Sequence, residues 1–269
     1  MKQYKRVLTI AGSDSGGGAG IQADIKAISA CGCFATSAIT AITAQNTLGV
    51  TDIHAIPVAT LKKQITAVLE DIGTDSVKIG MLHNSETIQA VNDVLQQFRI
   101  SNIVLDPVMV TTAGNTLLQT EAISALKNLL IPSARVITPN IPEAEVLLGE
   151  KIGSQDDLPE YAKALSLQGK VSVLLKAGHF SEKELIDVFY NAETDEVIKL
   201  KSRRVQSRNT HGTGCTLSSA FASFLAKGFT LNEAAEKAKE YTNNAIVDGA
   251  KYAIGKGHGA VNHFHQFWE

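Results

Sequence analysis

The chain has 269 residues, 44% hydrophobic and 19% charged, which is typical of globular proteins, and its net charge of −2 argues against a nucleic-acid or membrane-surface partner. The first ten residues have neither the layout of a signal peptide nor an apolar run that could cross a bilayer, so we expect a cytoplasmic protein that acts on small molecules. Its three cysteines, Cys31, Cys33 and Cys215, lack the spacing of a zinc or redox site, and we expect free thiols.

Apolar runs of high β propensity alternate with segments of helical spacing along most of the chain. The runs are apolar almost throughout, which favours a parallel sheet buried on both faces. The alternation itself indicates βαβ organisation. The expected strands are 7–11, 35–43, 76–82, 102–108, 135–139 and 171–177, and the expected helices are 19–30, 61–71, 86–98, 121–130 and 158–167.

The last third of the chain departs from this alternation. Residues 185–190 and 197–205 bracket a polar turn, which predicts a hairpin that adds an antiparallel edge to the sheet. Two helices, 216–226 and 231–247, are expected to end the chain. Because no repeat or Pro/Gly/Ser-rich linker interrupts the sequence, we predict one domain over 1–269.

The segment 209–220 contains Thr210 and then Gly212, Thr213, Gly214 and Cys215, a glycine-rich turn that leads directly into a helix. Glycine lets the backbone approach a ligand closely, and a helix start presents unpaired N–H groups, so this turn suits a phosphate. The positive end of the helix dipole is expected to lower the pKa of the Cys215 thiol, which would serve as nucleophile, base or hydrogen-bond donor. The alternative is an ordinary turn before a helix with a buried cysteine.

Ligands of such sheets bind beyond the carboxyl ends of the strands, where several polar residues occur. The loop 12–20 is rich in glycine but matches neither the dinucleotide nor the P-loop pattern, and it either shapes a polar pocket with Asp24 near its floor or is a flexible turn. Gln45 suits a heterocycle that carries an amino group beside a ring nitrogen, although exposed glutamine is the ordinary alternative. Met81, Met109 and Asp106 follow two further strands, and the methionines either line a site for a flat ring or belong to the core.

Two more strand ends suggest phosphate chemistry. Asn140 and Glu143 share the first turn of a helix and are oxygen ligands of the kind that holds Mg²⁺ through water, although Glu143 also suits the helix dipole alone. Lys176 ends a buried strand and either contacts a phosphate or is a solvated cap. His179, His211, His263 and His265 match no metal-site pattern and stay unassigned.

Six segments, taken in order, resemble the hydroxymethylpyrimidine/phosphomethylpyrimidine kinases of thiamin biosynthesis, within the ribokinase-like superfamily. The resemblance covers essentially the whole chain and is highly specific because both the segments and their spacing match. One departure is Ala177, where the family pattern has glycine. The segments are 11–24, 43–47, 78–82, 106–109, 138–144 and 209–218.

The resemblance implies a three-layer α/β/α fold that uses ATP and Mg²⁺ to phosphorylate a hydroxymethyl aminopyrimidine and then its monophosphate. It implies that Gln45 pairs with the pyrimidine, and that the Gly212–Cys215 turn is the anion hole. Lys176 would meet the transferring phosphate. The remaining implied residues are Gly12, Asp24, Met81 and Val108 around the ring, and Asp106, Asn140, Glu143 and Thr210 around the nucleotide and Mg²⁺.

Two alternatives stay open at this point. A pyridoxal kinase of the same superfamily acts on a similar ring, and a pyrimidine-binding sensor without catalysis would keep the pocket. Gln45 favours the aminopyrimidine over pyridoxal. The hairpin edge is also a plausible surface for a homodimer.

Overall fold

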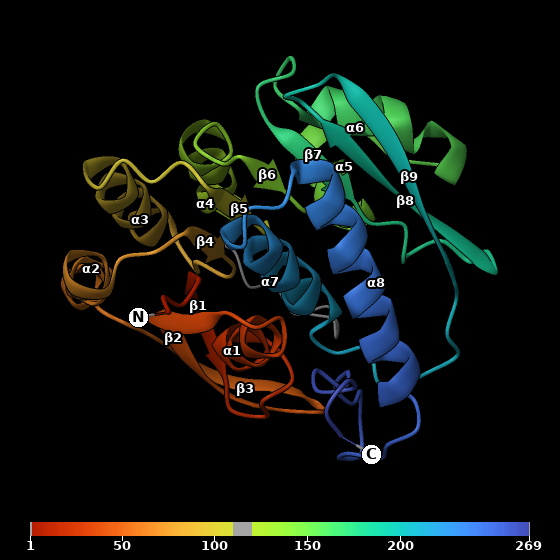
Figure 1. The fold of residues 1–269 in the computed structure, drawn as a ribbon, viewed down its shortest axis with the longest axis horizontal. Coiled ribbons are helices and arrows are strands. Elements are labelled where there is room, and N and C mark those ends of the chain that lie inside the picture. The colour runs from red at the N-terminus through yellow and green to blue at the C-terminus, as the bar shows by residue number, and fades with distance from the viewer. Residues whose placement is uncertain (1, 110–119, 269) are drawn as a thin grey trace.

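Nine strands form one sheet in the computed structural model, which describes residues 2–109 and 120–268. The sheet order is β3-β2-β1-β4-β5-β6-β7-β8-β9 (Figure 1). Neighbours from β2 to β7 pair in parallel, whereas β3, β8 and β9 pair antiparallel. The strands are β1 Arg6–Asp14, β2 Phe34–Asn46, β3 Gly49–Ala55, β4 Ser76–Ile79, β5 Ile103–Leu105, β6 Val136–Ile137, β7 Ser172–Leu175, β8 Glu184–Asn191 and β9 Glu196–Arg203.

Helices cover both faces of this sheet. On one face α7 lies between α1 and α8 and contacts both, while α2, α3 and α4 pack side by side on the other, followed by α5 and α6 (Figure 1). The helices are α1 Gly20–Ala30, α2 Val58–Ala67, α3 Ser85–Gln97, α4 Thr120–Ala125, α5 Ile141–Leu148, α6 Leu158–Leu165, α7 Thr213–Ala226 and α8 Leu231–Gly249.

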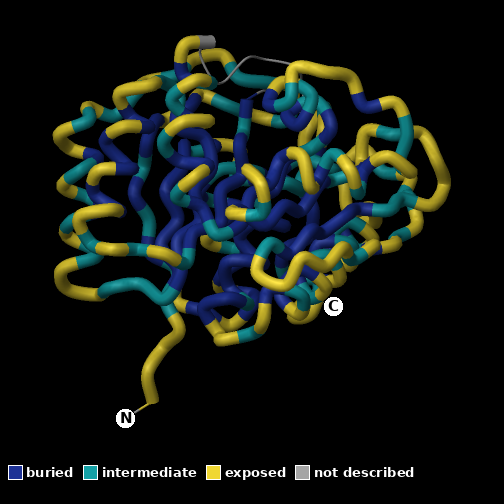
Figure 2. Tube along the Cα trace, turned by 90° about the horizontal axis from the view of Figure 1, so that it is seen from above, coloured by how far each residue is buried: buried dark blue, intermediate teal, exposed yellow. Residues whose placement is uncertain are grey.

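The strands separate two hydrophobic cores. Consecutive residues of a strand point to opposite faces, so Val7 packs beneath α1 and α7 while Leu8 packs beneath the other helix layer. Leu174 and Leu175 divide in the same way at the other end of the sheet. Burial is accordingly concentrated along the middle of the molecule (Figure 2). The predicted three-layer α/β/α fold with a mostly parallel sheet and an edge hairpin is confirmed.

The sequence-based elements differ from the structure at several boundaries. The antiparallel strand β3 was not predicted, because Thr51, Asp52 and His54 are exposed and the segment lacks apolar alternation. Helix α7 begins at Thr213, three residues before the predicted start, so Gly214 and Cys215 belong to its first turn. Strand β5 covers only three residues of the predicted 102–108, and the residues beyond it are free to turn into the cavity described below.

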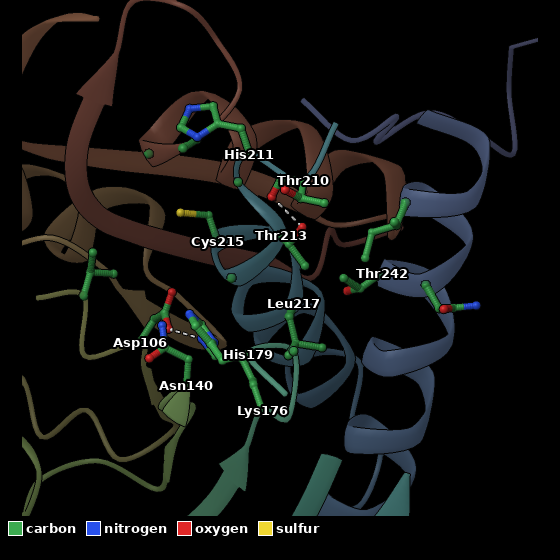
Figure 3. Close-up of a pocket in the computed structure, with 18 of the residues that line it drawn as sticks. Asp106, Asn140, Lys176, His179, Thr210, His211, Thr213, Cys215, Leu217 and Thr242 are labelled. Carbon is green, nitrogen blue, oxygen red and sulfur yellow. Dashed lines mark hydrogen bonds and ion pairs between the residues drawn. The ribbon is translucent and has the colours of Figure 1, made fainter. Parts of the chain in front are cut away.

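None of the helices among the described residues is long and apolar enough to cross a membrane. The parallel strands β1, β4, β5, β6 and β7 end at one edge of the sheet, and the first turn of α7 lies beside that edge (Figures 1 and 3). This arrangement brings together residues that are far apart in the sequence.

Candidate active site

A cavity of about 620 Å³ opens at the carboxyl ends of the parallel strands. Gln45 lines it together with the first turn of α7, so the predicted ring-binding residue and the predicted anion site share one cavity. The other predicted residues that line it are Gly12, Met81, Val108, Asp106, Asn140, Glu143, Lys176 and Thr210.

The first turn of α7 has the geometry of an anion site. Gly212 takes φ +78°, and a Cβ on it would lie 1.8 Å from the carbonyl oxygen of Gly18, so only glycine fits there. The first backbone bond of the helix runs from the Thr216 N–H to the Gly212 carbonyl at 2.9 Å. The N–H groups of Gly214 and Cys215 precede that bond and have no partner within the helix, so they are available to a ligand in the cavity.

Burial changes the expected state of Cys215. Burial raises the pKa of its thiol to about 11, although the nearby Lys78 cation acts in the opposite direction. The expectation that the helix field brings this pKa toward neutrality is therefore wrong for the structure as it stands. At neutral pH, Cys215 is a neutral thiol that can donate a hydrogen bond.

A charged cluster lines the cavity beside the first turn of α7 (Figure 3). The Lys176 ammonium lies 3.0 Å from Asp106 Oδ1 and 4.0 Å from Glu143 Oε2. The pKa of Lys176 is raised, because these two carboxylates outweigh the effect of burial. A Cβ added to Gly214 would meet Lys176 Nζ at 3.3 Å, which places the cation directly beside the first turn of α7.

Asn140 and Glu143 form a capping box at the start of α5. Asn140 Oδ1 accepts from the Glu143 N–H at 2.9 Å, and Glu143 Oε2 accepts from the Asn140 N–H at 2.8 Å. Burial raises the pKa of Glu143 to about 7, against the opposing effect of Lys176. The two residues therefore fix the helix start, which is the structural alternative weighed for Glu143, and they also line the cavity.

Asp24 does not line the cavity, in contrast to the prediction. Its carboxylate is fully buried and accepts from Lys78 Nζ at 2.8 and 2.9 Å, from Thr9 Oγ1 at 2.6 Å and from Ser219 Oγ at 2.8 Å. Lys78 reaches the cavity instead, and its pKa is raised because the charge of Asp24 outweighs burial. The sequence could not distinguish these two residues, because which one faces the cavity depends on how α1 packs on β1 and α7, beside β4.

Ala177 is accommodated without strain at the position of the family glycine. It is buried and does not adopt a positive φ, and its N–H donates to Asp187 Oδ1 at 2.8 Å. Alanine instead of glycine at this position therefore leaves the backbone beside Lys176 unstrained. Met81 also fits because of a glycine, since a Cβ on Gly12 would lie 2.5 Å from Met81 Cε.

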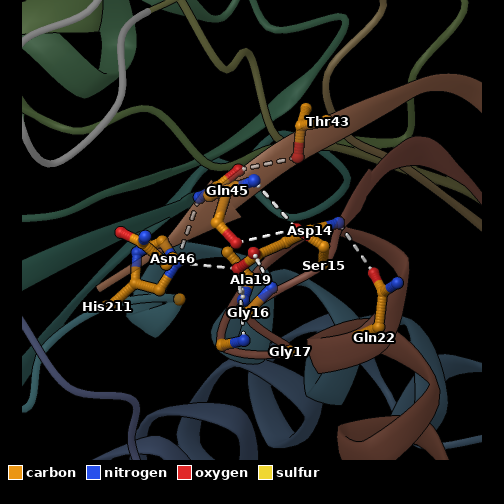
Figure 4. Close-up of polar contacts among 12 residues, drawn as sticks. Asp14, Ser15, Gly16, Gly17, Ala19, Gln22, Thr43, Gln45, Asn46 and His211 are labelled. Carbon is orange, nitrogen blue, oxygen red and sulfur yellow. Dashed lines mark hydrogen bonds and ion pairs between the residues drawn. The ribbon is translucent and has the colours of Figure 1, made fainter. Parts of the chain in front are cut away.

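Sequence reasoning missed Asp14 and left His211 unassigned, yet both line the cavity near Gln45 (Figure 4). His211 Nε2 lies 2.8 Å from Asp14 Oδ2 and 3.3 Å from Gln45 Nε2. The position of Asp14 two residues before three consecutive glycines was the available signal, because a carboxylate there accepts from several backbone N–H groups. No comparable signal marks the lining residues on β8, β9 and α8, which include Asp187, Arg203, Lys239, Thr242 and Asn243.

Comparison with known proteins identifies the family. Residues 14–262 match the phosphomethylpyrimidine kinase family. The chain is 49% identical to the hydroxymethylpyrimidine/phosphomethylpyrimidine kinase of Haemophilus influenzae, over 98% of both chains. It is 46% identical to the kinase of the same name from Rhizobium meliloti, over 97% of this chain and 98% of that protein.

Solved structures agree. The phosphomethylpyrimidine kinase of Clostridium difficile has a TM-score of 0.79 at 42% identity, covering 90% of this chain and 99% of its own. The pyridoxal kinase of Staphylococcus aureus, in complex with AMP-PCP and pyridoxal, has a TM-score of 0.89 at 31% identity. The match covers 99% of this chain and 96% of that chain. Identity is higher to the pyrimidine kinases, and the chain belongs to the hydroxymethylpyrimidine/phosphomethylpyrimidine kinase family.

Proposed function

We propose that this enzyme transfers a phosphoryl group from ATP to the hydroxymethyl group of an aminopyrimidine and then a second one to the resulting monophosphate. The observation that carries the proposal is that one cavity holds both Gln45 and the first turn of α7. A ring gripped by the amide would direct its substituent toward the free N–H groups of that turn. Phosphoryl transfer depends mainly on such positioning and on charge stabilisation.

Gln45 is proposed to bind the ring, because one amide supplies a donor and an acceptor side by side. Met81 and Val108 line the same cavity and would provide apolar surface for the ring, with Gly12 leaving room for Met81. Asp24 would act through Lys78, whose ammonium it holds.

The transferring phosphoryl group is proposed to lie between Lys176 and the N–H groups of Gly214 and Cys215. Lys176 is held by Asp106, so its cation is already in place before a substrate arrives. Thr210 stabilises the turn, because its carbonyl accepts a hydrogen bond from Thr213 Oγ1 at 2.8 Å. Loss of one such preorganised donor typically lowers a rate by about 10²–10³-fold.

The donor set of the cavity also fits Mg²⁺. Asp106 and Glu143 present carboxylates to the cavity, and Asn140 an amide. In the described part of the chain, no three His, Cys, Asp or Glu side chains form a metal cluster, in keeping with an ion that takes phosphate oxygens and waters besides one or two carboxylates. Glu143 and Asn140 would hold it through water. Bound there, the ion would neutralise charge on the nucleotide phosphates.

The proposal is tested by ATP consumption with hydroxymethylpyrimidine, its monophosphate and pyridoxal as acceptors. We expect the highest kcat/KM with the two pyrimidines, and we expect Gln45→Leu to lower kcat/KM for both pyrimidines by more than about tenfold. A clearly higher kcat/KM for pyridoxal would favour the second candidate, a pyridoxal kinase, which the similarity to the Staphylococcus aureus enzyme supports. Tight pyrimidine binding without ATP consumption would indicate a sensor.

A further inference from the structure

The side chains of Asp14, His211, Gln45 and Thr43 form one continuous polar network at the wall of the cavity (Figure 4). Asp14 Oδ1 accepts from the Gly16 N–H at 2.8 Å, and Oδ2 accepts from the Gly18 and Ala19 N–H groups at 3.1 and 2.8 Å. These bonds and the one from His211 outweigh burial and hold the pKa of Asp14 below its usual value. Asp14 is therefore an ionised carboxylate, which only accepts hydrogen bonds.

The ionised carboxylate determines which role His211 plays. Its Nε2 lies 2.8 Å from Asp14 Oδ2, so this nitrogen must carry a proton and donate it to Asp14. The ring cannot easily turn away, because it packs against the loop: a Cβ added to Gly18 would lie 2.5 Å from His211 Cδ2. A fixed N–H group therefore stands beside Gln45.

This fixed donor constrains the amide of Gln45. Its Nε2 lies 3.3 Å from His211 Nε2, which sets one donor against another. At the other end, Gln45 Oε1 lies 3.1 Å from Thr43 Oγ1, whose single proton is already donated to the Ser13 carbonyl at 2.7 Å. If the amide rotates by 180°, its nitrogen donates to Thr43 Oγ1, and its oxygen shares the His211 Nε2 proton with Asp14 Oδ2 in a three-centre bond, so neither contact sets like groups against each other.

We propose that His211, held by Asp14, is a positioning residue that fixes the amide of Gln45 with Oε1 toward His211 and Nε2 toward Thr43. In this orientation one lone pair of Oε1 and one N–H of Nε2 remain for a ligand. They match an amino group beside an unprotonated ring nitrogen. The reversed pattern, a carbonyl beside a ring N–H, would require the amide to turn its nitrogen back toward the His211 N–H group.

The inference rests on the proposed function, because it assumes that Gln45 pairs with the ring. It adds that His211 makes the enzyme select the amino form of the pyrimidine over its deaminated, 4-oxo form. A site that leaves a buried polar group mispaired rejects the wrong ligand strongly, whereas a freely turning amide would accept both forms.

The test measures equilibrium binding of 4-amino-5-hydroxymethyl-2-methylpyrimidine and its 4-oxo analogue by calorimetry, without nucleotide. We expect the wild-type enzyme to bind the amino form at least about 100-fold more tightly, because the 4-oxo form leaves two polar contacts mispaired. His211→Phe keeps a ring against Gly18 but removes the N–H, and it should reduce this ratio at least about tenfold, mainly through tighter binding of the 4-oxo form. His211→Gln retains an N–H donor and should restore part of the ratio.

Thr43→Val is the matched control at the other end of the amide. It removes a contact of similar strength but leaves the His211 donor, so the ratio should change by less than about threefold. Melting curves establish that each variant is folded. A general loosening of the site would weaken the binding of both ligands alike and would leave the ratio of their affinities unchanged.

Three outcomes overturn the inference. If the wild-type enzyme binds both forms equally, the amide is not fixed. If His211→Phe keeps the full ratio, another group fixes it. If the wild-type enzyme binds neither pyrimidine, the proposed function itself fails, and this result is distinguishable from the other two.

Discussion

Cys215 carries two opposing influences on its thiol. It occupies the first turn of α7, where the helix field favours a thiolate, but burial prevails and raises its pKa to about 11. A base is needed only when the acceptor is a hydroxyl group, since the monophosphate already presents an anionic oxygen. Because the thiol is neutral near pH 7, it would act as a base only through its small thiolate fraction, and only in the first transfer.

We predict that Cys215→Ser lowers the single-turnover rate of the first transfer by at least about tenfold and that of the second by less than about threefold. Rapid-quench measurement with each acceptor checks this difference. Thr216→Ser, in the same turn, keeps the hydroxyl that donates to the Gly212 carbonyl and should affect the two transfers equally. Equal losses for Cys215→Ser would show that the thiol serves neither step as a base.

Glu143 is expected to make folding stability depend on pH. Burial raises its pKa from 4.5 in the unfolded chain to about 7, so between these values the folded state binds more protons than the unfolded state. The free energy of unfolding therefore falls as pH rises through this window and levels off above it. In Glu143→Gln this part of the decline should vanish. Between pH 4.5 and 8 the free energy of unfolding should therefore fall by on the order of 1–3 kcal/mol less than in the wild type.

Urea unfolding of the ligand-free protein at a series of pH values measures this effect. Glu233→Gln is the matched control, because Glu233 forms an exposed capping box with Thr230 at the start of α8. The pKa of Glu233 is lowered by hydrogen bonds from Thr230, so its contribution has the opposite sign: it is present at neutral pH and lost as the solution is acidified. Parallel pH curves for wild type and Glu143→Gln would contradict the prediction.

At the scale of elements, a buried ion pair links α1 to β4. Lys78 and Asp24 are both fully buried, and removal of one partner leaves the other charge without compensation. We predict that Asp24→Asn lowers the free energy of unfolding by about 3–5 kcal/mol, and that Asp24→Asn combined with Lys78→Met costs less than the sum of the two single changes. A double-mutant cycle by urea unfolding measures the coupling.

An exposed ion pair provides the control for this cycle. Lys62 lies 3.2 Å from Asp93, but both side chains are more than two-fifths exposed, so Lys62→Ala should change stability by less than about 1 kcal/mol. A similar cost for Asp24→Asn and Lys62→Ala would mean that the buried pair has no special role in the fold.

The edges of the sheet bear on the predicted homodimer. The expected surface was the hairpin of β8 and β9, but the edge strand β9 exposes Lys199, Lys201 and Arg203, a pattern that discourages strand pairing. The opposite edge, β3, exposes Thr51, Asp52 and His54 and carries no lysine. We therefore expect the dimer contact at β3 instead.

We predict a homodimer whose dissociation constant rises at least about tenfold in Thr51→Lys, because a lysine on an edge strand opposes pairing. Lys199→Thr, on β9, should leave it unchanged. Sedimentation velocity over a dilution series measures both. A monomer at all concentrations would refute the prediction, and a response to Lys199→Thr alone would return the contact to the hairpin.

For the molecule as a whole, the periodicity of the sequence was enough to determine the parallel sheet, its two helix layers and the edge hairpin, because buried strands and amphipathic helices leave local patterns. The predicted site residues other than Asp24 line the cavity, since polar groups at the ends of parallel strands meet at one edge of the sheet. Only the tertiary structure decided that Lys78 rather than Asp24 faces the cavity, that Cys215 is a neutral thiol, and that Asp14 and His211 stand beside Gln45. Burial and contacts between distant segments set these features, and neither is encoded in any local pattern.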